Sequence, residues 1–139
     1  MKLQPYSSKV LALCGIILMG MGLYFVLFRP PLLPGDVRYI GTSFATIQEH
    51  VPHLLNWLNK VFWGMGAYMF TSGLLTLYTA ATSFRKRARG AAAVMALAGF
   101  SSIGWMTVVN FMLDSDFKWL LLAFALLWAC ASVLFWLGK

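Results

Sequence analysis

The chain has 139 residues, of which 60% are hydrophobic and only 11% are charged, and its formal net charge is +7. A soluble domain usually carries about 25% charged residues, and a chain of this size has too little interior to bury so much apolar surface. The composition therefore excludes a soluble globular fold and predicts a protein embedded in lipid. The basic residues lie beside apolar segments, so we interpret them as determinants of orientation and contacts with anionic lipid, not as a nucleic-acid surface.

Four apolar segments are each long enough to cross a bilayer, which takes roughly 20 residues. In chain order they cover about 10–28, 61–81, 91–113 and 117–137, and their cores contain no Asp, Glu, Lys, Arg or His. Pro30 and Pro31 end the first segment because proline cannot continue a helix. We therefore predict a single domain, 1–139, with an all-α fold: a four-transmembrane-helix bundle.

The connection between the first two segments, about 29–60, is long for a helix bundle, where a few residues are usual. Asp36 suits the cap of a short turn, and Thr42 or Ser43 suits the cap of a second short helix. We expect a short helical cap between the first and second spans, lying on the outer membrane surface.

Orientation follows from the Lys and Arg residues near the span ends, because cytoplasmic loops carry an excess of them. With the N-terminus inside, the cytoplasmic set is Lys2, Lys9, Arg85, Lys86, Arg87, Arg89 and Lys139, and the outer set is Arg29, Arg38, Lys60 and Lys118. The cytoplasmic set is the larger, and all the acidic residues fall outside. We predict that both termini are cytoplasmic.

Small residues recur along the spans at positions that suit close helix packing, which supplies much of the contact energy between helices in lipid. These positions are Gly15, Gly22, Gly66, Gly73, Ala80, Ala96, Gly99, Ala125 and Ala129. Their frequent seven-residue spacing is typical of a left-handed bundle of near-antiparallel helices. Alternatively, one of these seams is an interface between subunits.

Polar side chains in the outer half of the spans suggest a ligand pocket formed by Tyr68, Thr71, Thr107, Asn110 and Asp114. The last two are four residues apart and therefore share one helix face. An apolar molecule such as a quinone or a lipid is the ligand class that such a pocket suits. The alternative for the hydroxyl groups is hydrogen bonding to the backbone of their own helices.

His50 and His53 form a His-x-x-His pair, with the Glu49 carboxylate beside it. With Asp114 as a fourth candidate ligand, this cluster has enough side chains for a metal site. The same residues are the candidate catalytic groups of a membrane enzyme. Pro52 disturbs the local helix geometry, and no second helix offers a matching pair, so we expect no metal and no cofactor. The two cysteines, Cys14 and Cys130, lie within spans and lack redox spacing.

Three stretches carry a resemblance to a known group: Leu27-Phe28-Arg29-Pro30-Pro31-Leu32-Leu33-Pro34, then Arg38-Tyr39, then Trp63-Gly64-Met65-Gly66-Ala67-Tyr68-Met69. The chain resembles small bacterial four-helix inner-membrane proteins to which no activity is assigned. The resemblance implies a bundle in a bacterial inner membrane and lends no site residues. Size and span number are also similar to the membrane glutathione-transferase-like family, but those enzymes place charged residues within the bundle and this chain does not.

The sequence therefore favours a non-enzymatic membrane protein that acts by association, either with itself or as an accessory subunit of a larger membrane complex. Two alternatives stay open. One is a binder or carrier of an apolar small molecule, and the other is a membrane enzyme that uses the outer His and acid cluster.

Overall fold

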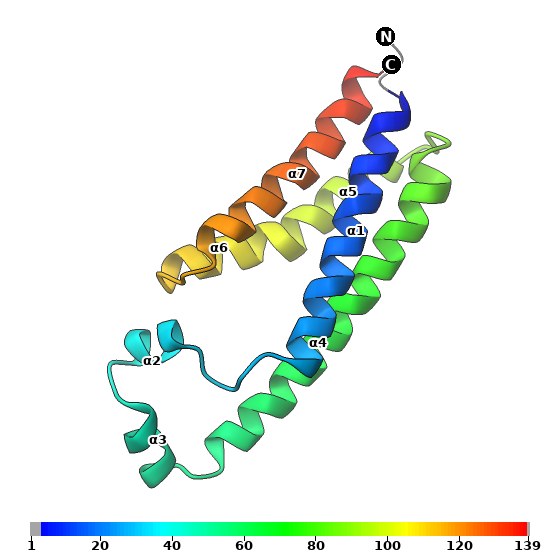
Figure 1. Cartoon of the computed structure of the whole chain (residues 1–139). Coiled ribbons are helices and arrows are strands. Elements are labelled where there is room, and N and C mark those ends of the chain that lie inside the picture. Colours follow the sequence, from blue (N-terminus) through cyan, green and yellow to red (C-terminus); the bar gives the residue numbers. More distant parts are fainter. Residues whose placement is uncertain (1–3, 139) are drawn as a thin grey trace.

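The structure, a computed structural model, describes residues 4–138, and all of its regular elements in that range are helices (Figure 1). In chain order they are α1 (Gln4–Leu27), α2 (Pro34–Ile40), α3 (Phe44–His50), α4 (Leu54–Thr79), the π-helical η1 (Ala80–Phe84), α5 (Ala91–Gly99), the π-helical η2 (Phe100–Gly104), α6 (Trp105–Met112) and α7 (Lys118–Leu137). The prediction of an all-α fold is confirmed for this part of the chain.

Three helical segments within residues 4–138 are long and apolar enough to cross a membrane: Tyr6–Leu27, Ala91–Met112 and Lys118–Leu137. The middle one runs without a break through α5, η2 and α6. α4 is 26 residues long but is not among them, because glycine, serine, threonine and tyrosine occupy many of its positions. Three such helices indicate a membrane protein, whereas the predicted span 61–81 stays a prediction.

α1 and α4 form a long antiparallel pair in which glycines face glycines. Gly15 lies against Gly73, and Gly22 lies against Gly66. A Cβ atom added to Gly15 would lie 2.8 Å from the backbone nitrogen of Leu77, which is closer than real Cβ atoms approach. The two backbones are therefore in contact only because these positions carry no side chain.

One seven-residue step closer to the start of α1, a serine takes the place of the glycine. The Ser8 hydroxyl donates to the Ala80 carbonyl oxygen over 2.6 Å, and both residues are buried. A hydrogen bond between helices is favourable here because both groups are withdrawn from water. Small residues at seven-residue steps in each helix thus form three successive layers of contact between α1 and α4.

The other helices join this pair through α7, which packs against α1 on one side and against α5, η2 and α6 on the other. Near the start of α1 the core is dense: the Phe84 ring is 1% exposed and lies 4.5 Å from the Phe135 ring, centroid to centroid. At the opposite end, α6 and the start of α7 lead away from α1 and α4 (Figure 1). The four long helical segments therefore form an open arrangement with two arms.

The small residues predicted to pack α5 and α7 differ from one another in their surroundings. Gly99 lies against the Trp128 indole, which a Cβ atom at residue 99 would overlap, and Ala125 packs against the core. Ala96 and Ala129, in contrast, are exposed. The reason is that a bulky indole, seated on a glycine, determines which faces of α5 and α7 turn inward.

The connection between α1 and α4 is held by local caps. The backbone N–H of Leu33 donates to Asp36 Oδ2 over 2.8 Å at the start of α2, which ends at Gly41 with a left-handed φ of 78°. The Ser43 hydroxyl accepts a hydrogen bond from the backbone N–H of Thr46 at the start of α3. These caps satisfy backbone groups that short helices otherwise leave unpaired.

Arg29 fastens this connection to the end of the α1–α4 pair. Its guanidinium carbon lies 3.5 Å from the centroid of the Phe62 ring, and Nη2 lies 3.2 Å from Asp36 Oδ2. Nη1 also donates to the Pro30 carbonyl oxygen over 2.9 Å, and the side chain is only 8% exposed. Burial lowers the pKa of Arg29, while the neighbouring Asp36 raises it, so the ion pair compensates in part for the lost hydration.

Replacing Arg29 with alanine is expected to detach α2 from α4. The loss of a shielded cation, its ring contact and its ion pair corresponds to about 2–4 kcal/mol of local stability. Hydrogen exchange of the α2 amides in detergent micelles measures this. Arg38→Ala is the control, because its pair with Asp116 (2.9 Å) is exposed on both sides and such pairs contribute less than about 1 kcal/mol. Equal exchange in the two variants contradicts the role given to Arg29.

Candidate functional site

The five residues of the predicted polar pocket are not brought together. Tyr68 and Thr71 lie on the exposed face of α4, and the Tyr68 side chain is 79% exposed. Thr107 and Asn110 belong to α6, and Asp114 follows in the turn before α7. Because α4 packs against α1 and α6 packs against α7, the two groups lie on different arms of the structure (Figure 1).

Three of these polar side chains, those of Thr71, Thr107 and Asn110, bond to their own helices. The Thr71 hydroxyl donates to the Ala67 carbonyl oxygen over 3.1 Å, and the Thr107 hydroxyl donates to the Ile103 carbonyl oxygen over 2.7 Å. The Asn110 amide donates to the carbonyl four residues before it over 2.9 Å. Bonding back to the helix satisfies a polar group in lipid without a neighbouring helix, which is why no shared polar pocket forms.

Asp114 closes the turn between α6 and α7. Its backbone has a positive φ of 50°, and its carboxylate pairs with the Lys118 ammonium one helical turn later. The hydrogen bond and charge of Lys118 hold the pKa of Asp114 below its usual value. The side chain thus belongs to the turn itself.

The predicted His and acid cluster is spread over the end of α3 and the start of α4. The His50 ring nitrogen Nδ1 lies 3.0 Å from the Thr46 carbonyl oxygen, while Glu49 and His53 are exposed. Within residues 4–138, no group of three His, Cys, Asp or Glu side chains is placed to hold a metal ion. The described geometry therefore offers no observation that favours an enzyme at this cluster.

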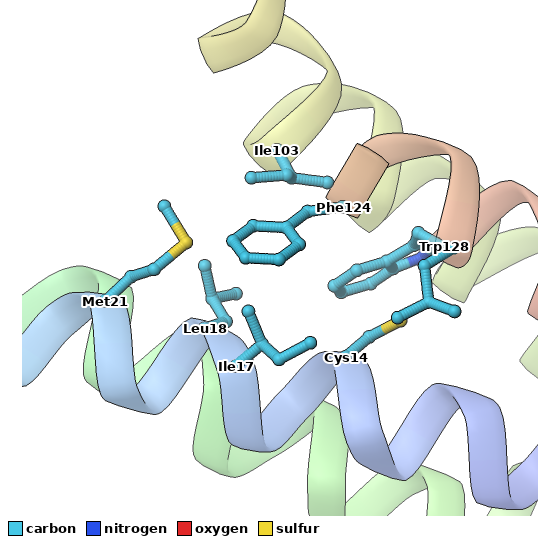
Figure 2. A pocket seen from close by; sticks show the side chains of 8 residues that line it. Cys14, Ile17, Leu18, Met21, Ile103, Phe124 and Trp128 are labelled. Carbon is cyan, nitrogen blue, oxygen red and sulfur yellow. The ribbon is translucent and has the colours of Figure 1, made fainter. Parts of the chain in front are cut away.

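An apolar cleft that the sequence did not suggest lies between α1, η2 and α7 (Figure 2). Apolar side chains from all three elements line it: Cys14, Ile17, Leu18 and Met21 from α1, Ile103 from η2, and Phe124, Leu127 and Trp128 from α7. In Figure 2 the labelled α1 side chains point toward the Phe124 and Trp128 rings. The cleft is apolar but narrow, with a free volume of about 10 Å³, which is roughly the space that one water molecule needs.

Trp128 forms the rigid end of this cleft. Its indole Nε1–H donates to the Met95 carbonyl oxygen over 2.8 Å, and the ring sits in the space that Gly99 leaves free. The π-helical turn η2 follows directly after Gly99, and such turns widen a helix locally and are frequent at functional sites. The spacing between a glycine on one span and a tryptophan on another gives no signal in the sequence.

A second hollow lies where α2 meets the turn after α6. Gly35, Asp36, Tyr39, Ile40, Leu113 and Ser115 line it. The ion pair between Arg38 and Asp116 connects the same two segments over 2.9 Å. α2 thus bridges the two arms at the open end of the structure.

The exposed face of α4 carries small residues among larger ones. Between residues 64 and 78 it carries Gly64, Ala67, Tyr68, Thr71, Leu75 and Tyr78, which lie on one side of the helix. A Cβ atom added to Gly64 meets no atom within 4 Å, so the α4 backbone is open to a neighbour at this point. This face, which we name the α4 outer face, lies opposite the glycines that contact α1 because the two sets are offset by half a helical turn.

No family model matches this sequence, and neither a curated protein nor a solved structure is similar to it in the comparisons made.

Proposed function

We propose that this chain is a four-span membrane protein without catalytic activity, which acts by associating with other membrane subunits through the α4 outer face. The partner is a second copy of the chain or a subunit of a larger membrane complex. The observation that carries the proposal is the character of this face. It is exposed within the chain and carries the small residues Gly64, Ala67 and Thr71 between larger side chains.

Packing supports the inclusion of α4 among the spans. α4 and the start of η1 are in contact with α1 from Gly66 to Ala80, so a bilayer around α1 surrounds this part of α4 as well. Small residues on a lipid-exposed helix permit a second helix to approach closely, which is the main source of helix association in lipid. Gly64, where an added Cβ atom meets nothing within 4 Å, leaves the α4 backbone open to such an approach.

Charge supports the proposed orientation, with both termini in the cytoplasm. Arg85 and Arg89 lie in the loop at the same end of the structure as the start of α1 and the end of α7 (Figure 1). The acidic residues lie in the connections at the other end. Lys2 and Lys139, which the sequence also assigns to the cytoplasmic side, lie outside the described residues. Together with the sequence resemblance, this distribution favours a bacterial inner membrane.

The proposal is tested by placing a bulky side chain on the α4 outer face, which blocks the close approach of a second helix. Ala67→Leu fills the space beside Gly64 and is expected to convert an assembly in mild detergent into single chains. Light scattering coupled to size-exclusion chromatography gives the protein mass, and mass spectrometry of the purified particle identifies any other subunit. A multiple of 15.5 kDa indicates self-association, and a fixed set of other membrane proteins indicates an accessory subunit.

Ala129→Leu is the matched control, because Ala129 is an exposed alanine on α7, away from α4. It is expected to leave the assembly intact. A wild-type particle that contains one chain and no partner contradicts the proposal, as does an assembly that survives Ala67→Leu unchanged.

A second candidate function is binding of an apolar small molecule at the cleft in Figure 2, whose lining is apolar but whose free volume is only about 10 Å³, so that its side chains must move apart to admit a ligand. Its lining comes from α1, η2 and α7 and not from the polar residues that the sequence suggested. Phe124→Leu keeps the lining apolar but removes its aromatic ring, and is expected to reduce the amount of any lipid or quinone extracted with the protein. Mass spectrometry of the organic extract measures this, and an extract identical to that of empty detergent micelles rejects the function.

A further inference from the structure

The cytoplasmic end of the structure contains a cation that no described residue of the chain neutralises. Arg87 lies in the loop between η1 and α5, and its guanidinium carbon lies 4.6 Å from the centroid of the Phe135 ring. The Nε and Nη2 atoms are shielded from solvent and have no hydrogen-bond partner among the described residues. An unpaired shielded charge is costly unless an anion compensates for it.

Among the residues that the structure describes, the surroundings of Arg87 add positive charge and no negative charge. Arg85, Lys86 and Arg89 are exposed in the same loop, and Lys9 is exposed on the first turns of α1. All the acidic side chains belong to Asp36, Glu49, Asp114 and Asp116, in the connections at the opposite end. The electrostatic potential at this end is therefore positive, because none of the described elements packed around Arg87 contributes an acidic side chain.

We infer that this end binds the phosphodiester headgroup of an acidic phospholipid, with Arg87 at the centre of the site and Arg85, Lys86 and Arg89 around it. The inference rests on the proposed membrane function, which places this loop at headgroup depth. A phosphate accepts charge-assisted hydrogen bonds from guanidinium groups, and Coulomb attraction reaches the shielded part of Arg87 across several ångströms of low-dielectric surroundings.

We assign the ligand to a lipid because the structure also offers an apolar surface for its acyl chains. Exposed apolar residues flank the loop on the neighbouring helices: Val94 and Leu97 on α5, and Val133 and Leu137 on α7. Acyl chains below a bound headgroup would lie along these side chains. Free phosphate shares the headgroup chemistry but gains nothing from this apolar rim.

The site is tested with the full chain in an uncharged detergent, by titrating phosphatidylglycerol, phosphatidylcholine with the same acyl chains, or inorganic phosphate while thermal unfolding is followed. Phosphatidylglycerol is expected to raise the unfolding temperature, and the other two are expected to leave it nearly unchanged. Stabilisation by phosphatidylcholine to the same extent, or by inorganic phosphate alone, overturns the inference.

Two substitutions in the same loop separate a central cation from a peripheral one. Arg87→Gln is expected to weaken the apparent phosphatidylglycerol affinity about tenfold or more, because a hydrogen-bonded charge is lost. Arg85→Gln removes an equal but exposed charge and is expected to weaken it about fivefold at low salt. Near 0.5 M salt, with screening over about 4 Å, the effect of Arg85→Gln should vanish and that of Arg87→Gln should persist.

Equal effects of the two substitutions at high salt overturn the central place of Arg87. Where Arg87→Gln does not fold, Arg87→Lys keeps the charge and is expected to retain the preference for phosphatidylglycerol; a folded Arg87→Lys protein without that preference also overturns the inference. The particle mass of the same samples reports separately on association. A single-chain particle that still prefers phosphatidylglycerol refutes the proposed association and supports the lipid site.

Discussion

Gly22→Leu is expected to separate α1 from α4 and to lower the stability of the protein by more than about 3 kcal/mol, at the upper end of overpacking effects. A Cβ atom at this position would lie 2.6 Å from the carbonyl oxygen of Gly66. The atom that must move is in the backbone, so no change of rotamer relieves the clash. Circular dichroism during titration of a mild detergent with dodecyl sulfate measures the loss as an earlier midpoint.

Gly20→Leu is the matched control on the same helix. A Cβ atom at Gly20 meets nothing within 4 Å, and leucine favours a helix over glycine by about 0.8 kcal/mol. The control is therefore expected to be neutral or slightly stabilising, opposite in sign to Gly22→Leu. If both substitutions lower the midpoint equally, the α1–α4 contact is not built on Gly22 and Gly66.

The elements of this fold were accessible from the sequence because each depends on local chemistry. Ser43, one of the two cap candidates in the sequence, caps α3. The predicted apolar segments also end close to where the long helices end. The glycines at seven-residue steps in α1 and α4 also carry information, since a position without a side chain can lie only in a close contact or on an open face. Gly22 and Gly20 show both outcomes on one helix.

The arrangement of the helices was less accessible, because in a membrane segment almost every face is apolar. Periodicity then no longer distinguishes Leu18, which is buried in the core, from Ile16, which is exposed. Polar residues are equally ambiguous: Thr107 and Thr71 were expected to share a pocket, yet each bonds to its own helix. The apolar cleft depends on contacts between residues more than 80 positions apart, for which a single sequence contains no signal.

The cleft also depends on one side chain whose removal we expect to be severely destabilising. Trp128 is buried between α7, α5 and η2, and its indole N–H is bonded to the Met95 carbonyl oxygen. Trp128→Ala leaves a cavity of nearly the size of the ring, for which about 3–5 kcal/mol of stability is typically lost. The loss is measured as the shift in the dodecyl sulfate midpoint, followed by circular dichroism.

Trp105→Ala removes the same side chain from an exposed position on α6, where the residue is 59% exposed, and is expected to change stability by less than about 0.5 kcal/mol.

The two tryptophan variants also test whether the cleft can hold an apolar molecule. Because Trp128 closes one end of the cleft, its removal enlarges the space available to an apolar molecule, and such a molecule should restore part of the stability that Trp128→Ala loses. Indole is the natural probe. If indole raises the midpoint of Trp105→Ala as much as that of Trp128→Ala, it acts through the detergent and not through the cleft.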